Sequence, residues 1–285
     1  MNSYLAITPA RDEDGLLPGL IASMAAQKCR PARWIIIDDG SADRTAALVD
    51  AAACEHSWVH AVHLPRSKPR AEGGESVTEK ILRGEEWRAY DYLLRLDADL
   101  SFDSDMVCGL LREFARDPQL GIAGPLLLES KSDAWRPVIQ PRFHTRGAAK
   151  MYSRDCLLAI GPPEGGLGWD TLDEVRAMVA GFRTRHFPDI HARHHRPQGA
   201  VGGTWKARRA AGFAAYRIGY SPIFLIARAM RLALGKSGPV GATALLAGFF
   251  EGYGKHVERP ASPEMIAFVR RQQLRRLFRQ ETLWQ

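Results

Sequence analysis

Apolar and polar residues follow two alternating periods through the first part of the chain. Short apolar runs bounded by turn residues are typical of buried strands, and apolar residues three or four positions apart are typical of helices. This pattern predicts strands at Tyr4–Thr8, Trp34–Ile37, Val59–Leu64 and Asp91–Asp97, and helices at 14–27, Ala46–Ala53, 77–88 and Ser104–Ala115. Such a series builds a mostly parallel, Rossmann-like sheet flanked by helices, with ligands bound beyond the carboxyl ends of the strands. Ser41 is predicted to cap the second helix.

The pattern changes after residue 118. Strand-like pieces surround several prolines, a glycine-rich loop spans 161–168, and a helix at Asp170–Gly181 is followed by strands at Phe182–Phe187 and Ile190–His195. From about 206 the chain becomes apolar and basic, with a helix predicted between Ser221-Pro222 and Gly235, a second apolar stretch at Pro239–Phe250 and a basic segment after Ser262. We therefore expect an α/β domain over 1–205 and a helical extension over 206–285.

Composition narrows the class of protein. The 285 residues are 46% hydrophobic and 25% charged, which is ordinary for a globular protein. The mean hydropathy is −0.23, and no run reaches the roughly 18 apolar residues of a membrane-spanning helix. The N-terminus lacks the pattern of a signal peptide. The four cysteines fit no zinc or redox spacing, which predicts reduced thiols in a cytosolic chain.

Charge is concentrated near the C-terminus. From Lys206 onward there are 14 Lys and Arg against 4 Asp and Glu, so this segment carries +10 and the rest of the chain −3. A basic tail on a nearly neutral body indicates an anionic partner, either a nucleic acid or a membrane surface. The tail lacks a nucleic-acid-binding motif and its aromatic residues form no stacking platform, so the membrane surface is the favoured interpretation. The alternative is that these helices pack on the α/β domain or on a second subunit.

Two acidic clusters end predicted strands. Asp38-Asp39-Gly40-Ser41 follows one apolar strand, where carboxylates can accept hydrogen bonds from a base and a ribose. Asp97-Ala98-Asp99 ends another, and alternate positions of an extended chain point to one side, which suits a hard divalent cation. The same residue types also favour helix caps and turns.

Two further clusters lie later in the chain. Trp169-Asp170 precedes a predicted helix, where Asp170 can act as a general base and Trp169 can stack on a sugar ring; an acid at a helix start is also expected for capping alone. His191, His194 and His195 stand beside Arg193 and Arg196, a group that can supply a metal ligand and contacts to a diphosphate. A basic solvated turn would have the same spacing.

Together these residues resemble those of glycosyltransferase family 2, the inverting enzymes with a GT-A fold, from about Tyr4 to Arg196. Thr8-Pro9-Ala10-Arg11-Asp12 is similar to the family's first nucleotide-contacting loop, with Arg11 where many members have Asn. The resemblance implies that the following residues bind a nucleotide sugar: Pro9, Ala10, Arg11, Asp12, Asp38, Asp39, Arg66, Asp97 and Ala98. It further implies that Asp99 ligates Mn²⁺ or Mg²⁺, with His194, or nearly as well His195, as a further ligand.

The family's later signature is an acidic residue followed by Arg six positions on and Gly eleven positions on. Asp170, Arg176 and Gly181 match that frame, which implies that Asp170 is the catalytic base. The preceding residue is Trp169 instead of the usual Glu, and both Trp169 and Asp173 are expected to border the acceptor pocket. The C-terminal extension resembles that of bacterial members that build surface or extracellular polysaccharides.

The sequence thus predicts transfer of a sugar from a nucleoside-diphosphate sugar, most often a UDP-sugar in this family, to a hydroxyl of a glycan acceptor that is lipid-linked. The enzyme is expected in the cytoplasm, peripheral on the inner face of the membrane, without a nucleic-acid partner. One alternative keeps the fold and transfers the sugar to a polyprenyl phosphate. A sugar-phosphate nucleotidyltransferase would need a glycine-rich N-terminal signature that Thr8–Gly15 lacks. A non-enzymatic nucleic-acid-binding protein is the lowest alternative.

Overall fold

The computed structural model describes residues 3–66, 77–84, 86–131, 134–163, 165–196, 203–235 and 238–284. The chain divides into two compact units. The sheet unit comprises Met1–Gly165 with Ala180–Arg196, and the helical unit comprises Gly166–Val179 with Pro197–Gln285. The helix that begins at Trp169 is thus grouped with the C-terminal helices, whereas the division into 1–205 and 206–285 stays a prediction.

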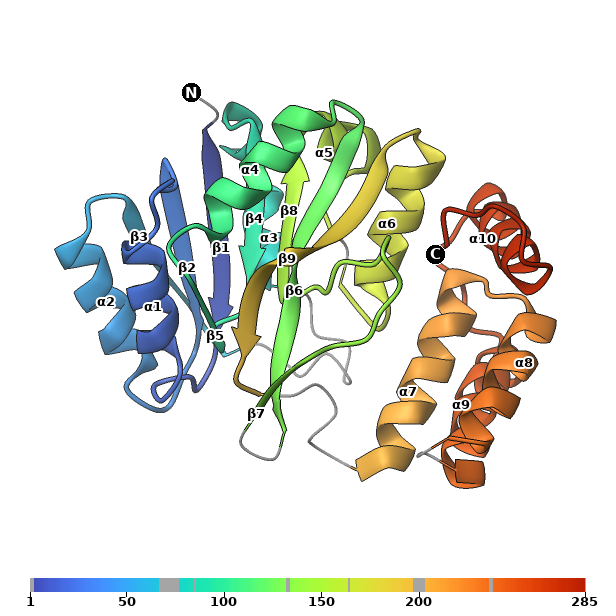
Figure 1. Cartoon of the computed structure of the whole chain (residues 1–285). Helices are drawn as coiled ribbons and strands as arrows, with labels where there is room; N and C mark the ends of the chain where they lie inside the picture. The colour runs from blue at the N-terminus through green and yellow to red at the C-terminus, as the bar shows by residue number, and fades with distance from the viewer. Residues whose placement is uncertain are drawn as a thin grey trace. The chain divides into compact units, whose positions relative to one another are not determined.

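The sheet unit is built on one mixed sheet (Figure 1). Its strands are β1 (Tyr4–Ala10), β2 (Arg33–Asp39), β3 (Val59–Leu64), β4 (Tyr92–Leu96), β5 (Leu100–Phe102), β6 (Leu120–Lys131), β7 (Ala134–Pro137), β8 (Ala149–Ser153) and β9 (Arg183–His194). Their order is β3-β2-β1-β4-β8-β6-β9-β5, and β7 pairs with β6. Strands β3, β2, β1 and β4 are parallel, as predicted, whereas β8 enters antiparallel to β4 and β6.

Helices connect these strands and cover the sheet. They are α1 (Leu17–Ala25), α2 (Thr45–Glu55), α3 (Val77–Leu82), α4 (Met106–Arg116) and α5 (Arg154–Ile160), with a 3₁₀ turn at Glu86–Ala89. Leu17, Leu20 and Met24 recur at helical spacing on α1 and are fully buried in the core. The central residues of β2 form a continuous apolar run, as expected for a strand that is buried on both faces.

Several local expectations are corrected by the structure. Ser41 does not cap α2; its Oγ accepts a hydrogen bond from the Asp12 N–H at 3.0 Å, and the N-cap position belongs to Arg44. The strands predicted at Phe182–Phe187 and Ile190–His195 are one strand, β9, with an irregularity in its register against β6. Helix α5 is not predicted by the pattern. It directly follows β8, and its apolar run is too short to be distinguished from a continuation of that strand.

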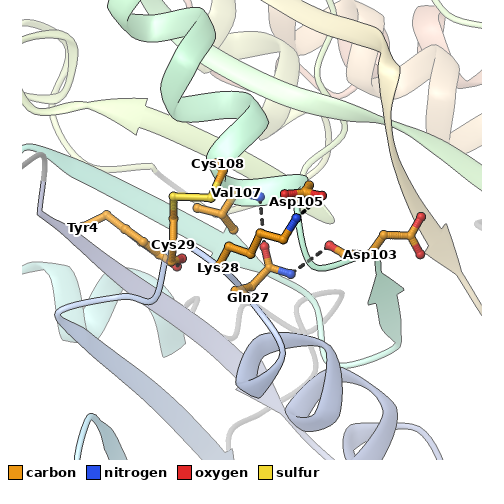
Figure 2. Close-up of a disulfide and its surroundings, with 8 residues drawn as sticks. All are labelled: Tyr4, Gln27, Lys28, Cys29, Asp103, Asp105, Val107 and Cys108. Carbon is orange, nitrogen blue, oxygen red and sulfur yellow. Dashed lines mark hydrogen bonds and ion pairs between the residues drawn. A yellow bond between two sulfur atoms is a disulfide. The ribbon is translucent and has the colours of Figure 1, made fainter.

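The expectation of reduced cysteines is wrong for two of them. Cys29, which follows α1, forms a disulfide with Cys108 of α4, across a sequence separation of 79 residues (Figure 2). The segments that carry them are also joined by hydrogen bonds from Gln27 Nε2 to the Asp103 carbonyl and from the Val107 N–H to Gln27 Oε1, at 2.8 and 3.0 Å. The disulfide therefore joins two segments that already pack together.

Because this bond closes a long loop, Cys108→Ser is expected to lower the free energy of unfolding by about 2–4 kcal/mol when no reductant is present. Denaturant titration with and without dithiothreitol measures the effect, which should vanish when both proteins are reduced. The exposed, unpaired Cys54 supplies the control Cys54→Ser, which should leave stability unchanged. Four titratable thiols in unreduced, denatured wild-type protein would contradict the disulfide.

The helical unit contains α6 (Trp169–Val179), α7 (Gly203–Ile218), α8 (Pro222–Ala233), α9 (Gly238–Gly254) and α10 (Pro263–Leu277). Helices α7 and α9 approach closely at Gly212 and Gly248, where an added Cβ would overlap the backbone of the partner helix. Gln273 Oε1 accepts from the Ser221 N–H at 2.8 Å, which ties α10 to the start of α8. Within the described residues, no helix has both the length and the apolar character needed to cross a membrane.

Candidate active site

The ends of β1, β2 and β3 form a connected polar cluster. Asp38 and Asp39 are the last two residues of β2 and are buried. Asp38 accepts from the Ser41 N–H at 3.1 Å and lies 3.4 Å from His63 Nδ1, at the end of β3. Asp39 forms an ion pair with Arg11, whose Nε also donates to the Asp39 carbonyl at 3.2 Å. The two carboxylates are thus fixed at the carboxyl edge of the sheet.

Asp12 lies in the loop after β1 and links that loop to the loops that follow β2 and β3. Its carboxylate accepts from the Ala42 N–H and from Arg66 Nη2, each at 2.7 Å, and these two hydrogen bonds lower the pKa of Asp12. Arg66 also donates to the Gly40 carbonyl at 3.3 Å. Gly40 has a φ of 63°, and a side chain there would overlap the backbone of Arg66. Of the residues predicted to bind the nucleotide, Arg11, Asp12, Asp38, Asp39 and Arg66 are therefore brought together, with Pro9 and Ala10 ending β1 beside them.

A second cluster lies beyond β4. One ligand atom each from Asp97, Asp99 and His194 can be chosen so that all lie within 4.8 Å of one another. His194 ends β9, and the β5–β9 ladder places it opposite Leu100, the neighbour of Asp99. His194 Nε2 is 3.3 Å from Asp99 Oδ2, and both side chains are nearly inaccessible, with relative exposures of 4% and 8% for the residues.

The donors of this cluster fit a divalent cation. Carboxylate oxygens with an imidazole nitrogen suit Mn²⁺, and oxygen donors suit Mg²⁺. Asp99 Oδ1 and His194 Nδ1 are buried and have no hydrogen-bond partner among the described residues. Burial lowers the pKa of His194, but the hydrogen bond to Asp99 and the charges of Asp99, Asp97 and Glu129 outweigh it and raise the pKa above its ordinary value. The cluster thus favours a positive charge.

The other residues of this motif have different surroundings. Asp97 Oδ1 is 2.8 Å from Nη2 of the buried Arg95, which fixes that carboxylate. Ala98 is buried in the hydrophobic core, so its side chain serves packing. His195 Nε2 is 2.8 Å from Ser101 Oγ, and its ring meets the Trp135 ring edge-on. The structure therefore places His194, and not His195, beside both carboxylates.

The candidate base belongs to the helical unit. Asp170 is the second residue of α6, and its Oδ1 accepts from the Thr171 N–H at 2.9 Å. Trp169 begins the helix, and Asp173 is buried on it together with Glu174. Burial raises the pKa of Tyr220, the charge of Arg228 lowers it, and the charges of Glu174 and Asp170 raise it again, so both carboxylates of α6 lie within electrostatic reach of Tyr220.

Residues 5–163 match the sequence profile of the family described as Glycosyl transferase family 2. That match covers more than half of the chain. The chain belongs to glycosyltransferase family 2. The resemblance stated from the sequence is thereby confirmed, and two solved structures confirm the fold class.

Relatives of this glycosyltransferase include poly-beta-1,6-N-acetyl-D-glucosamine synthase of Staphylococcus aureus strain MSSA476, which is 28% identical over 122 residues. That alignment covers 42% of this chain and 28% of the synthase, so the chain corresponds to little more than a quarter of its relative.

Two solved structures show the same fold as this glycosyltransferase. A mannosyltransferase from Pyrobaculum calidifontis, solved with GDP-Man and Mn²⁺, matches with a TM-score of 0.58 at 18% identity over 93% of this chain and 73% of its own. S. aureus TarS residues 1–349, solved with UDP-GlcNAc, matches with a TM-score of 0.55 at 16% identity over 93% of this chain and 79% of its own.

Three polar residues of the candidate site are not singled out by the sequence. His63 contacts Asp38, Glu129 Oε1 lies 3.7 Å from His194 Nδ1, and Glu13 pairs with Arg196. Each reaches the site through pairing of segments far apart in the sequence, as when β6 places Glu129 opposite His194. Of the three, only Glu13 could have been noticed from the sequence, because it directly follows Asp12 of the first loop.

Proposed function

We propose that the chain is an inverting glycosyltransferase that moves a sugar from a nucleoside-diphosphate sugar to a hydroxyl of a lipid-linked glycan acceptor in bacterial polysaccharide synthesis. The grouping of Asp97, Asp99 and His194 at the edge of the sheet carries this proposal. It lies on the same sheet as the Asp38–Asp39 cluster, which suits the base and ribose of a nucleotide. The proteins of the same fold that were solved with UDP-GlcNAc and GDP-Man support this donor class.

In this mechanism Asp38 and Asp39 hold the nucleoside, and Asp97 and Asp99 orient the donor. Asp170 accepts the proton of the acceptor hydroxyl as that oxygen attacks the anomeric carbon. The bond from that carbon to the diphosphate breaks on the opposite side, which inverts the configuration. Mn²⁺ or Mg²⁺ held by Asp99 and His194 would supply positive charge for the leaving diphosphate. Trp169 and Asp173 are proposed to border the acceptor.

A thermal-shift panel of UDP, GDP and dTDP, each with and without Mn²⁺, tests the donor class. We expect one nucleoside diphosphate to raise the melting temperature, and to do so much more strongly with Mn²⁺. The corresponding nucleosides without phosphate serve as controls for base recognition alone. Absence of any shift across the whole panel would contradict the proposed donor class.

We also propose that the helical unit binds a membrane surface, which would place the enzyme peripherally on the inner face of the cytoplasmic membrane. Helix α8 exposes Ile223, Ile226 and Met230 at helical spacing, and Leu234 follows at its end with 92% of its surface accessible. The last turns of α10 and the residues after it expose Leu274, Leu277 and Phe278, and four exposed arginines are interspersed with them in the sequence: Arg271, Arg275, Arg276 and Arg279. Apolar side chains can enter the acyl boundary while arginines meet lipid phosphates.

Full-length protein is expected to sediment with phosphatidylglycerol vesicles at low salt and to be released as salt rises. Met230→Asp should lower the bound fraction several-fold, because it places a charge in the apolar stripe of α8. Ala51→Asp adds the same charge at an exposed position of α2 in the sheet unit and should bind as the wild type does. Protein that stays in the supernatant at low salt would contradict membrane binding.

A further inference from the structure

An ion pair connects the first loop to the end of β9. Arg196 Nη1 donates to Glu13 Oε1 at 2.9 Å, and Nη2 donates to Oε2 at 2.7 Å. Glu13 directly follows Asp12 of the nucleotide cluster, and its N–H donates to Thr45 Oγ1 at 2.8 Å. Arg196 stands two residues after His194. The pair therefore bridges the two polar clusters of the sheet unit through a two-point contact.

The pair lies within the electrostatic field of the metal cluster. Burial raises the pKa of Glu13, the Arg196 hydrogen bonds lower it, and the charges of Asp99 and Asp97 raise it again. Hydrogen bonding to Glu13 raises the pKa of Arg196, burial lowers it, and the charges of Glu13 and Asp99 raise it again, so that the pKa lies above its ordinary value. The geometry agrees, because the N–H of His195, the residue before Arg196, donates to the Asp99 carbonyl at 3.0 Å, so a ligand at the metal cluster would experience the charges of this pair.

Arg196 retains donors for a ligand. The Glu13 side chain is only 12% exposed, but that of Arg196 is 50% exposed. A guanidinium carries five N–H donors, and the fork with Glu13 uses one on each of its two terminal nitrogens. The remaining donors suit phosphate oxygens, for which the planar fork of arginine is well matched.

Arg66 is placed differently. Its hydrogen bonds go to Asp12 and to the Gly40 carbonyl, so it holds the loops of the nucleotide cluster together. Arg196 instead directly follows His195, whose N–H donates to the Asp99 carbonyl at 3.0 Å, so Arg196 stands next to the metal cluster.

We propose that Arg196 binds the diphosphate of the donor beside Asp97, Asp99 and His194, and that Glu13 is the positioning residue that holds Arg196 there. This inference rests on the proposed function, because it assumes a nucleoside-diphosphate donor. Glu13 orients the guanidinium before the donor arrives, so less side-chain freedom is lost on binding.

Isothermal titration tests this inference with UDP and GDP in Mn²⁺, and with UMP and GMP as ligands that lack the second phosphate. Arg196→Gln should weaken the nucleoside diphosphate on the order of 10- to 100-fold and change the monophosphate little, because the lost contacts are charge-assisted hydrogen bonds. Arg196→Lys keeps the charge without the fork and should show an intermediate loss. The matched variant Arg66→Gln should weaken both ligand classes alike.

Glu13→Gln should weaken the diphosphate several-fold, and the double variant Glu13→Gln/Arg196→Gln should be no weaker than Arg196→Gln, since the two residues act as one unit. Titration with Mn²⁺ alone provides a separate readout: Arg196→Gln should bind Mn²⁺ at least as well as wild type, because a nearby positive charge is removed. Equal loss for mono- and diphosphate, or weakened binding of Mn²⁺ alone, would overturn the role of Arg196.

Two negative results would have different meanings. Wild-type protein that binds neither UDP nor GDP would overturn the proposed function and this inference with it. Wild-type protein that binds a nucleoside diphosphate only as strongly as Arg196→Gln does would overturn the inference alone.

Discussion

Asp99→Asn is expected to abolish the Mn²⁺-dependent binding of a nucleoside diphosphate, with a loss of at least about 100-fold, since changes even in residues that only support metal ligands cost 10- to 100-fold. Asp99 supplies a buried oxygen without a hydrogen-bond partner among the described residues, next to the imidazole of His194. An amide of the same shape keeps the packing but loses the negative charge. Titration with Mn²⁺ alone measures metal binding, and subsequent titration with UDP and GDP measures nucleotide binding.

A matched control separates this loss from a general effect of charge. Asp103 lies just beyond β5, is largely exposed and pairs with Arg193 at 3.2 Å. Asp103→Asn removes the same charge at the opposite end of β5 and should leave Mn²⁺ binding unchanged. If Asp99→Asn retained both its Mn²⁺ affinity and its requirement for Mn²⁺, the assignment of Asp99 as a ligand would be wrong.

Asp170→Asn is expected to keep nucleoside-diphosphate binding and to lower turnover by about 10²- to 10⁴-fold, the range typical of a lost general base. The expectation rests on the frame of Asp170, Arg176 and Gly181 and on the position of Asp170 at the start of α6. Transfer of labelled sugar from UDP-GlcNAc or GDP-Man into the lipid and polymer fractions of host membranes measures turnover. Glu258→Gln, at an exposed position of the helical unit, is the control.

The acceptor decides what an unaffected Asp170→Asn variant would mean. A hydroxyl must lose a proton as it attacks, whereas a polyprenyl phosphate is already anionic and needs no base. Turnover that barely changes in this variant would therefore contradict the hydroxyl acceptor and favour polyprenyl phosphate. Mild acid hydrolysis followed by sizing of the released label distinguishes the two, because a sugar on a polyprenyl phosphate is released as a monosaccharide, whereas a sugar on a glycan hydroxyl is released as part of a larger oligosaccharide.

The first half of the sheet is predictable because each of its strands is marked by residues that are neighbours in the sequence. Apolar runs such as Trp34–Ile37 have the length of buried strands, and each acidic cluster directly follows such a run. Parallel strands bring their carboxyl ends to one edge, so the sequence alone is enough to expect Asp38 and Asp99 on one sheet. Helix α8 is likewise predictable from its Pro at the start and Gly after its end.

The rest of the site depends on pairing between distant segments. Sequence spacing does not separate His194 from His195, because neighbouring side chains of a strand point to opposite faces and only the register against β5 decides which one meets Asp99. The Cys29–Cys108 bond and the pair of Glu13 with Arg196 arise in the same way. Helix α7 is not predicted by the pattern because arginines and alanines obscure its apolar stripe.

The pairing of β5 with β9 also has a consequence during synthesis of the chain. Asp99 leaves the ribosome 95 residues before His194, and the histidine reaches the aspartate only when β9 has joined the sheet between β6 and β5. A nascent chain that ends before β9 already carries Asp38, Asp39 and Asp97 but lacks the imidazole. A cation bound as proposed by Asp99 and His194 would therefore gain its full set of protein ligands only after the last strand has joined the sheet.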